Sequence, residues 1–140
     1  MATAAHSDQV VWHIVSKWNA SQRKVRGGDW GKKAHGNTVL FSRENGNLMN
    51  EHSYKFSGFA NSKALDLQID EGKVEFGVKT TKASAPPKLY ANTKMNKGFR
   101  RVVNSIRKQG VTNFYRADLH NAALARWTAL NRAAKIQKGV

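Results

Sequence analysis

Apolar and polar residues alternate with a period of two in the middle of the chain. Every second position is apolar in two runs, residues 65–69 and 74–78. The residues between these runs include Glu71 and Gly72 and have the composition of a tight hairpin turn. A similar alternation surrounds Tyr54 and Phe56. The pattern therefore predicts an antiparallel meander over about residues 54–80.

Beyond residues 83–88, where two adjacent prolines predict an extended linker, the apolar period changes to that of a helix. A first helix is predicted from Asn92 or Thr93 to a left-handed cap at Gly110. Its expected apolar face comprises Met95, Phe99, Val102, Val103 and Ile106. A second helix is predicted from about residues 117–118 to Gly139. Its expected apolar stripe comprises Leu119, Ala123, Trp127, Leu130 and Ala134.

The N-terminal third is less regular. Residues 10–15 are apolar and fit either a helix capped at Ser7 or a buried strand. Residues 38–41 predict a short strand, and residues 44–47 predict a turn after it. The fold class that follows is α+β, with a small antiparallel sheet followed by two basic amphipathic helices. We expect a β-rich domain over 1–83 with a basic loop at 23–36, a Pro-containing linker at 84–92, and a helical extension over 93–140.

The charge is strongly positive and unevenly distributed. The chain carries 24 Lys and Arg against nine Asp and Glu, for a net charge of +15 and a pI near 10.5. Residues 84–140 hold twelve of the basic groups and one acid, Asp118. Such a field favours a polyanionic partner, and nucleic acid is the commonest one. The absence of cysteine fits a reducing compartment, and no apolar run is long enough to predict a membrane span.

The sequence lacks the constellations that common catalysis needs. It has no Gly-rich phosphate loop, dinucleotide fingerprint or nucleophile elbow, and its five histidines show no metal-ligand spacing. Asp66 and Asp70 alternate along one face of the predicted strand, so a weak two-carboxylate nuclease site is one hypothesis. The alternative, which we favour, is a solvated sheet face. We therefore expect no enzyme, no metal, no cofactor and no small-molecule substrate.

The first predicted C-terminal helix carries a basic face without acids. Lys94, Lys97, Arg101 and Lys108 fall at helical spacing opposite the apolar face, and Arg100 and Arg107 flank them. An ordinary solvated helix would intersperse Glu and Asp, but none occurs between residues 88 and 117. The face therefore favours phosphate binding. The second helix adds further candidates, Arg116, Arg126 and Arg132.

A basic, Gly-rich segment near the N-terminus is a second candidate. It mixes one aromatic residue with five basic ones: Arg23, Lys24, Arg26, Trp30, Lys32 and Lys33. Unpaired RNA bases stack on aromatic side chains while Arg and Lys contact phosphates, so this composition suits irregular RNA. The alternative is a charged loop that Trp30 tethers to the core.

Several motifs together resemble a known family. They begin with Trp12, then Phe41-Ser42-Arg43 and Asn47-Leu48, and continue with the most specific stretch, residues 52–63 (His-Ser-Tyr-Lys-Phe-Ser-Gly-Phe-Ala-Asn-Ser-Lys). The last is Tyr115-Arg116-Ala117-Asp118-Leu119, followed by Ala122-Ala123 and Arg126. In this order they resemble family number twenty-eight of the eukaryotic large ribosomal subunit proteins. Ala117 stands where that family usually has Pro, and residues 27–36 look longer than usual.

The resemblance implies an α+β component of the cytosolic 60S subunit that bridges rRNA segments and neighbouring proteins, with no catalytic role and no membrane partner. It also implies nucleolar assembly. The motif residues that it carries over are Asn47, Tyr54, Lys55, Lys63, Arg116 and Arg126. With Arg43, they complete the RNA-binding candidates already named.

Three alternatives stay open at this point. A nucleolar assembly factor with a similar N-terminal domain would bind pre-rRNA transiently. Such factors look longer, with acidic tails and cluster-holding cysteines, whereas this chain has no cysteine and ends at Val140. A free DNA-binding protein and a nuclease come third and fourth.

Overall fold

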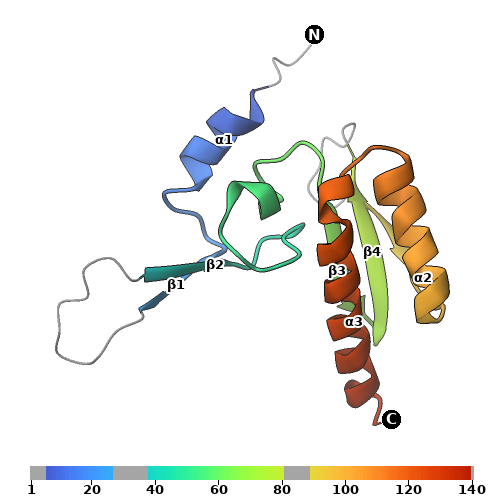
Figure 1. Ribbon diagram of the computed structural model, residues 1–140. Coiled ribbons are helices and arrows are strands. Elements are labelled where there is room, and N and C mark those ends of the chain that lie inside the picture. The colour runs from blue at the N-terminus through green and yellow to red at the C-terminus, as the bar shows by residue number, and fades with distance from the viewer. Residues whose placement is uncertain (1–5, 27–37, 81–88, 140) are drawn as a thin grey trace.

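The computed structural model describes residues 6–26, 38–80 and 89–139. A three-stranded sheet covered by two helices forms the C-terminal part, and a helix, a two-stranded ribbon and a compact loop region form the N-terminal part (Figure 1). The two parts lie beside each other, and the loop region with its short green helix stands between the ribbon and the sheet (Figure 1). The predicted α+β class is confirmed.

The sheet is antiparallel, with strand order β3-β4-β5. Strands β3 (Leu65–Asp70) and β4 (Lys73–Lys79) form the predicted hairpin. Glu71 and Gly72 form its two-residue turn, and both have positive φ, +46° and +70°. That combination matches the twist of the strands, and glycine adopts it without strain. The hairpin prediction is therefore confirmed.

The third strand, β5 (Tyr90–Lys94), pairs with β4 and falls where the sequence predicted the start of a helix. Pairing extends past the strand, because the Met95 amide donates to the Val74 carbonyl at 2.8 Å. Helix α2 (Phe99–Ile106) therefore begins several residues later than predicted. The prediction was wrong because backbone pairing with β4 outweighs the local 3.6 period. The linker predicted at 84–92 lies partly outside the described residues, and its last residues belong to β5.

Helix α2 runs directly into a π-helical segment, η3 (Arg107–Thr112). Gly110 lies inside this segment and does not have the left-handed conformation predicted for a cap. A 3-10 turn, η4 (Ala117–Leu119), then leads into α3 (His120–Gln137), and Gly139, at φ +72°, ends the helical region. The second helix is thus confirmed at both ends, whereas the cap at Gly110 was wrong.

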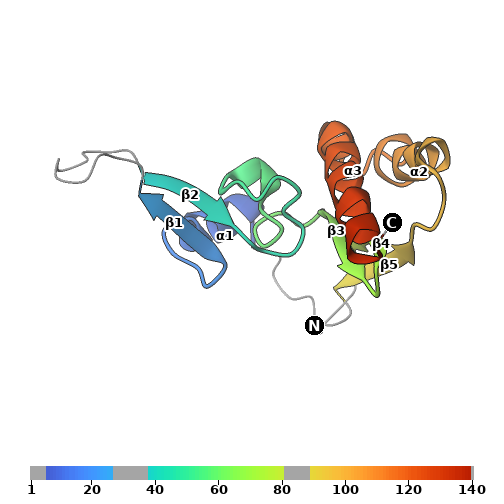
Figure 2. The same cartoon turned by 90° about the horizontal axis from the view of Figure 1, so that it is seen from below.

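Helices α2 and α3 run antiparallel on one face of the sheet (Figures 1 and 2). The core between these helices and the sheet is apolar. Four positions of the predicted apolar stripe are buried in it, three from α3 and one from η4. These are Leu119, Ala123, Trp127 and Ala134. Strand residues Leu65, Leu67, Val74 and Phe76 face them, together with Val102 and Ile106 of α2. The apolar stripe predicted for α3 is therefore the core.

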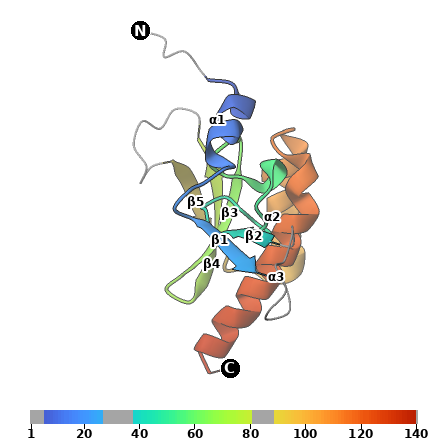
Figure 3. The same ribbon diagram turned by 90° about the vertical axis from the view of Figure 1, so that its left-hand side faces the viewer.

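The N-terminal part resolves the ambiguity at residues 10–15 as a helix, α1 (Asp8–Val15). Strands β1 (Gln22–Arg26) and β2 (Thr38–Ser42) pair antiparallel in full register. Figure 3 shows α1 and this ribbon on the side turned toward the viewer, in front of the sheet. The predicted strand at 38–41 is confirmed, but the basic loop expected from residue 23 begins with a strand. Residues 27–36 of that loop lie outside the described residues.

The segment around Tyr54 is not a strand. Residues Tyr54–Phe56 form a 3-10 turn, η1. The Asn61 side-chain amide donates to the carbonyls of Tyr54 and Ser57 at 2.7 and 2.8 Å, which holds the chain in a compact loop. Side-chain bonds to the backbone compete with strand pairing in this way. The first strand of the predicted meander was therefore wrong, although its hairpin was right.

Candidate nucleic-acid interface

The second half of the molecule exposes a continuous set of basic side chains along α2 and η3. Arg100, Arg101, Arg107 and Lys108 are all exposed, and Lys97 is exposed just before α2. Val102 and Ile106, on the opposite face of α2, are fully buried. Among the described residues, Arg100, Arg101 and Lys108 form no ion pair. We call Arg100, Arg101, Arg107 and Lys108 the basic stripe.

Helix α3 adds basic groups at its C-terminal half. Arg132, Lys135 and Lys138 are exposed, and Arg126 is half-buried on the flank of the core stripe. The start of α2 and the end of α3 lie at the same end of the molecule, because the two helices are antiparallel (Figure 1). Positive charge from the two helices therefore converges at that end.

Lys94 does not belong to this surface. It lies in β5, and its ammonium group is 3.5 to 3.8 Å from carboxylate oxygens of Asp70, Glu71 and Glu75. Glu71 and then Asp70 are the main causes that raise the pKa of Lys94. The helical spacing that joined Lys94 to the basic face does not exist, because residues 90–94 are a strand.

The same contacts bear on the carboxylate site considered for a nuclease. Three of the four hairpin acids surround the Lys94 ammonium, and the fourth, Asp66, accepts hydrogen bonds from the Leu67 amide and the Gln68 side chain. No group of three or more metal-ligating side chains occurs in the part of the chain that the structure describes. Three of the four hairpin acids thus pair with a lysine.

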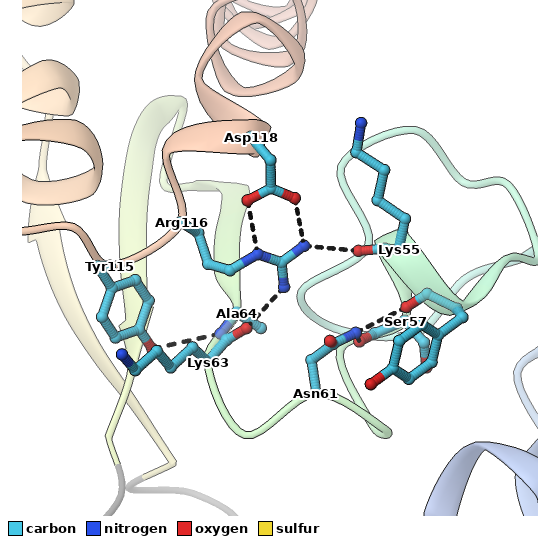
Figure 4. A network of polar contacts seen from close by, with 9 residues as sticks. Lys55, Ser57, Asn61, Lys63, Ala64, Tyr115, Arg116 and Asp118 are labelled. Carbon is cyan, nitrogen blue, oxygen red and sulfur yellow. Dashed lines mark hydrogen bonds and ion pairs between the residues drawn. The ribbon is translucent and has the colours of Figure 1, made fainter. Parts of the chain in front are cut away.

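Arg116 occupies a structural junction rather than the outer surface (Figure 4). Its guanidinium binds Asp118 at two points, Nε to Oδ1 and Nη2 to Oδ2, both 2.9 Å. It also donates to the carbonyls of Lys63 and Lys55, each at 2.8 Å. The hydrogen bond to Asp118 is the main cause that lowers the pKa of that carboxyl group. Arg116 therefore ties the start of α3 to the 52–63 loop.

Tyr115 strengthens the same junction. Its hydroxyl donates to the Lys79 carbonyl at 2.6 Å and accepts from the Ala64 amide at 3.2 Å, and burial raises its pKa. The Lys63 ammonium lies 5.7 Å from the Tyr115 ring centroid, a cation–π geometry. The Tyr-Arg-x-Asp-Leu motif of the sequence is thus a clamp between the two halves of the fold.

Lys79 joins the clamp from β4. Its ammonium group donates to the carbonyls of Gly58 and Asn61 at 2.8 and 2.7 Å. Burial lowers the pKa of Lys79, and the nearby carboxylates of Asp8 and Glu44 act in the opposite direction. This lysine is therefore used inside the fold and is not offered to a partner.

Asn47 has a similar structural role. It is 4% exposed, and its amide donates to the Glu51 carbonyl at 2.8 Å and to Glu44 at 3.3 Å. The buried Glu44 carboxylate also accepts from Ser57 and from the Phe59 amide. The predicted turn at 44–47 is confirmed, and its polar side chains fix it against the 52–63 loop.

Gly58 and Gly46 explain why the 52–63 motif contains a glycine. A Cβ on Gly58 would overlap the Asn45 carbonyl oxygen, and a Cβ on Gly46 would overlap the Tyr90 hydroxyl. The backbones of the two loops therefore approach at a distance that only glycine permits. The Tyr90 hydroxyl donates to the same Asn45 carbonyl at 3.1 Å, and burial raises its pKa.

The remaining N-terminal candidates are exposed or lie outside the described residues. Arg23, Lys24, Arg43 and Lys55 are exposed. Tyr54 is 37% exposed and packs its ring 6.0 Å from that of Trp12. The backbone of Arg26 pairs with Thr38 in β1. Trp30, Lys32 and Lys33 lie outside the described residues.

Sequence reasoning missed a groove between the start of α2 and the end of α3. Lys97, Phe99, Asn131 and Lys135 line it, and an adjoining hollow is lined by Lys73 and Lys138. Phe99 was predicted in the core but is 51% exposed. Its exposed place at the first residue of α2, in a groove that Lys97 and Lys135 also line, could not be read from helical spacing alone.

In the part of the chain that the structure describes, no helix combines the length and the hydropathy of a bilayer span.

The sequence is similar to known proteins over most of its length. The model of a family described as the Ribosomal L28e protein family matches residues 10–133. The large ribosomal subunit protein eL28 of Dictyostelium discoideum is 37% identical over 81 residues. Those residues make up 58% of this chain and 53% of the relative, so the chain spans about half the length of the curated relative it matches.

Proposed function

The chain belongs to the Ribosomal L28e protein family, and from this premise we propose that it is a structural component of the large subunit of the eukaryotic cytosolic ribosome. The family match confirms the resemblance inferred from the motifs. The Dictyostelium relative is named as a large-subunit protein, which supports the same assignment. A net charge of +15 fits a component whose main partner is rRNA.

The proposed mechanism is charge neutralisation. Lysine and arginine side chains displace counterions from phosphates, which makes binding strong at low salt and independent of base identity. The observation that carries the proposal is the basic stripe on α2 and η3, which has no acidic residue within its helix and two fully buried residues behind it. The sheet and the α3 core give this stripe a rigid support.

The proposed RNA-binding surface is narrower than the set of candidates from the sequence. We keep the exposed groups: Arg23, Lys24, Arg43, Lys55, Lys63, Lys97, Arg100, Arg101, Arg107, Lys108 and Arg132. Arg126, Arg26 and Tyr54 stay proposals at the margin of this surface, as do Trp30, Lys32 and Lys33. Arg116, Asn47 and Lys94 are assigned structural roles instead, because their side chains are engaged by named partners.

The partners that follow are rRNA and neighbouring large-subunit proteins, with no small-molecule substrate and no membrane. The protein would act in the cytoplasm on the ribosome after assembly in the nucleolus. We propose no catalytic role.

The basic stripe is tested by charge reversal. The triple variant Arg100→Glu, Arg101→Glu, Arg107→Glu should lose binding to purified large-subunit rRNA and incorporation into particles. The matched variant with Lys at the same three positions keeps the charge and should retain both, because the mechanism needs charge rather than a planar guanidinium. Circular dichroism of both variants checks that the sheet is folded. Normal rRNA binding by a folded Glu variant would contradict the assignment of this stripe as the anchor.

A further inference from the structure

The groove between α2 and α3 has the shape and lining of a small binding site. It has a volume of about 530 Å³ and is walled by residues 96–99 on one side and by Trp127, Asn131 and Lys135 of α3 on the other. A second hollow of about 340 Å³ shares Asn96, Lys97 and Asn131 with it and continues toward the β3–β4 turn. We call the two together the basic groove.

The charge of the basic groove is entirely positive. Lys73, Lys97, Lys135 and Lys138 line it, and none of its lining residues is Asp or Glu. The acids nearest along the chain, Asp70, Glu71 and Glu75, are those paired with Lys94. These three carboxylates exceed the single charge of Lys94, so surplus negative charge stands beside Lys73, which pairs with Asp70 in the hairpin. Lys97 and Lys135 line the larger hollow with no acid among its lining residues, and phosphate would neutralise them.

The first turn of α2 opens onto the groove and is uncapped. Its N-cap is Gly98, no side chain accepts from its first amides, and its first turn contains no acid. Gly98 and Phe99 both line the groove. The positive end of the helix dipole and the first backbone amides therefore face a space that already holds Lys97 and Lys135, an arrangement that favours a phosphate group.

Trp127 is a second aromatic residue in the wall of the groove. It lines the groove and is 4% exposed, yet its indole Nε1 has no hydrogen-bond partner among the described residues. A buried indole N–H normally has an acceptor. The Nε1 atom is shielded from solvent, but Trp127 lines the groove, so a ligand bound there would change the surroundings of this indole.

Phe99 gives the site a preference for an unpaired base. Its ring packs against Trp127, with centroids 5.9 Å apart and an angle of 38° between planes. Phe99 is nevertheless 51% exposed, so one side of the ring is supported and the rest is open. A supported, exposed aromatic ring beside lysines is the usual platform for a base of single-stranded nucleic acid. A duplex keeps its bases stacked internally and cannot use it.

We propose that the basic groove binds one unpaired RNA nucleotide, its base stacked on Phe99 and its phosphate held between Lys97 and Lys135 at the start of α2. Asn131 lines both hollows, and in this proposal its amide bonds the base edge or the ribose hydroxyl. This site rests on the proposed function, because it specifies which form of RNA one part of the surface takes. It also separates this groove from the basic stripe, which binds phosphates regardless of strand state.

The test compares the full chain bound to fluorescein-labelled single-stranded RNA of about ten nucleotides and to an RNA duplex of the same length. Phe99→Leu should weaken single-strand binding by about tenfold and leave duplex binding unchanged, since only base stacking is lost. Phe99→Tyr keeps an aromatic ring and should restore the affinity. The unfolding midpoint of each variant confirms that the fold is intact.

The phosphate contacts are tested in the same assay. The double variant Lys97→Gln, Lys135→Gln should reduce the preference for single strands. The control Lys17→Gln, Arg132→Gln removes the same number of charges, at exposed positions outside the groove. It should lower affinity for both RNAs by the same factor. In NMR spectra, the Trp127 indole N–H resonance, identified by its loss in Trp127→Phe, should shift on addition of the single strand.

The outcomes separate the site from the function. Equal losses for single strand and duplex in the groove variants, or an unmoved Trp127 resonance at saturating single strand, would overturn the nucleotide site while leaving rRNA binding in place. Failure of the unmodified chain to bind any rRNA would overturn the proposed function and the site together.

Discussion

Arg116 and Asp118 form a two-point ion pair in which both nitrogen–oxygen distances are 2.9 Å, and the same guanidinium spans to the backbone of the 52–63 loop. The two residues are two positions apart, at the start of the helical region that completes the core. Arg116 also binds backbone carbonyls more than fifty residues away in the sequence. A local sequence motif thus fixes the contact between the two halves of the fold.

Replacing Arg116 by Ala should therefore lower stability. It removes charge-assisted bonds to two carbonyls and one carboxylate, and we expect a loss of about 2 kcal/mol in the free energy of unfolding. Arg132→Ala, at an exposed position of α3, should change it by less than about 0.5 kcal/mol. Urea denaturation measures both. Equal stability of the two variants would refute the clamp.

The Tyr115 hydroxyl should contribute separately. Tyr115→Phe keeps the ring but removes bonds to Lys79 and Ala64, so we expect a loss of about 1 to 2 kcal/mol. Tyr54→Phe is the matched control, because Tyr54 is partly exposed and its hydroxyl has no hydrogen-bond partner among the described residues. Its loss should be under about 0.5 kcal/mol in the same denaturation assay. A similar cost for both would mean that the Tyr115 bonds do not matter.

Acid should weaken the same junction. The pKa of Asp118 in the folded state lies below its ordinary value of 3.8, chiefly because of the hydrogen bond from Arg116. The stabilisation of the fold by ionised Asp118 is therefore present above pH 3.8, and it is lost as the pH falls through the lowered pKa of the folded state. The unfolding midpoints of the unmodified chain and of Asp118→Asn should differ at pH 6 and converge in strong acid. A difference that grows with acid would reverse the assigned sign.

Replacement by alanine should have opposite effects on stability at two glycines, because only Gly58 lies where two loops approach closely. Gly58→Ala would drive a Cβ into the Asn45 carbonyl and should cost at least about 2 kcal/mol. Gly110→Ala places its Cβ 3.6 Å from the Leu65 side chain, an ordinary contact, within a helical segment. We expect it to be neutral or to stabilise by up to about 1 kcal/mol. The thermal unfolding midpoints of the two variants test this prediction. A Gly58→Ala variant as stable as the unmodified chain would show that the loops can separate.

The elements predicted correctly are those that local pattern alone determines. The β3–β4 hairpin combines strict alternation with a two-residue turn at Glu71 and Gly72, and both signals act within a few residues. The α3 stripe is likewise local, because helical spacing brings Trp127 and its neighbours onto one face. Such patterns survive in the fold because nothing distant competes with them.

The elements predicted wrongly depend on partners that the local hydrophobic pattern does not include. Strand β5 forms because the free edge of β4 is available for backbone pairing, and nothing in the sequence of residues 90–94 indicates that edge. The Tyr54 turn forms because Asn61 reaches back to its carbonyl. Candidate site residues divide in the same way. Exposed Arg100 and Arg101 were predictable from charge spacing, whereas the internal role of Arg116 and the exposure of Phe99 follow only from tertiary contacts.

The most direct test of the central claim is sedimentation of the tagged protein through sucrose gradients of a eukaryotic cell lysate, at low and at high salt. A structural large-subunit protein should co-migrate with 60S subunits, 80S ribosomes and polysomes, and should remain there at high salt. Confinement to pre-ribosomal fractions would contradict that claim and indicate an assembly factor, and a pool at the top of both gradients would leave only a general basic nucleic-acid binder.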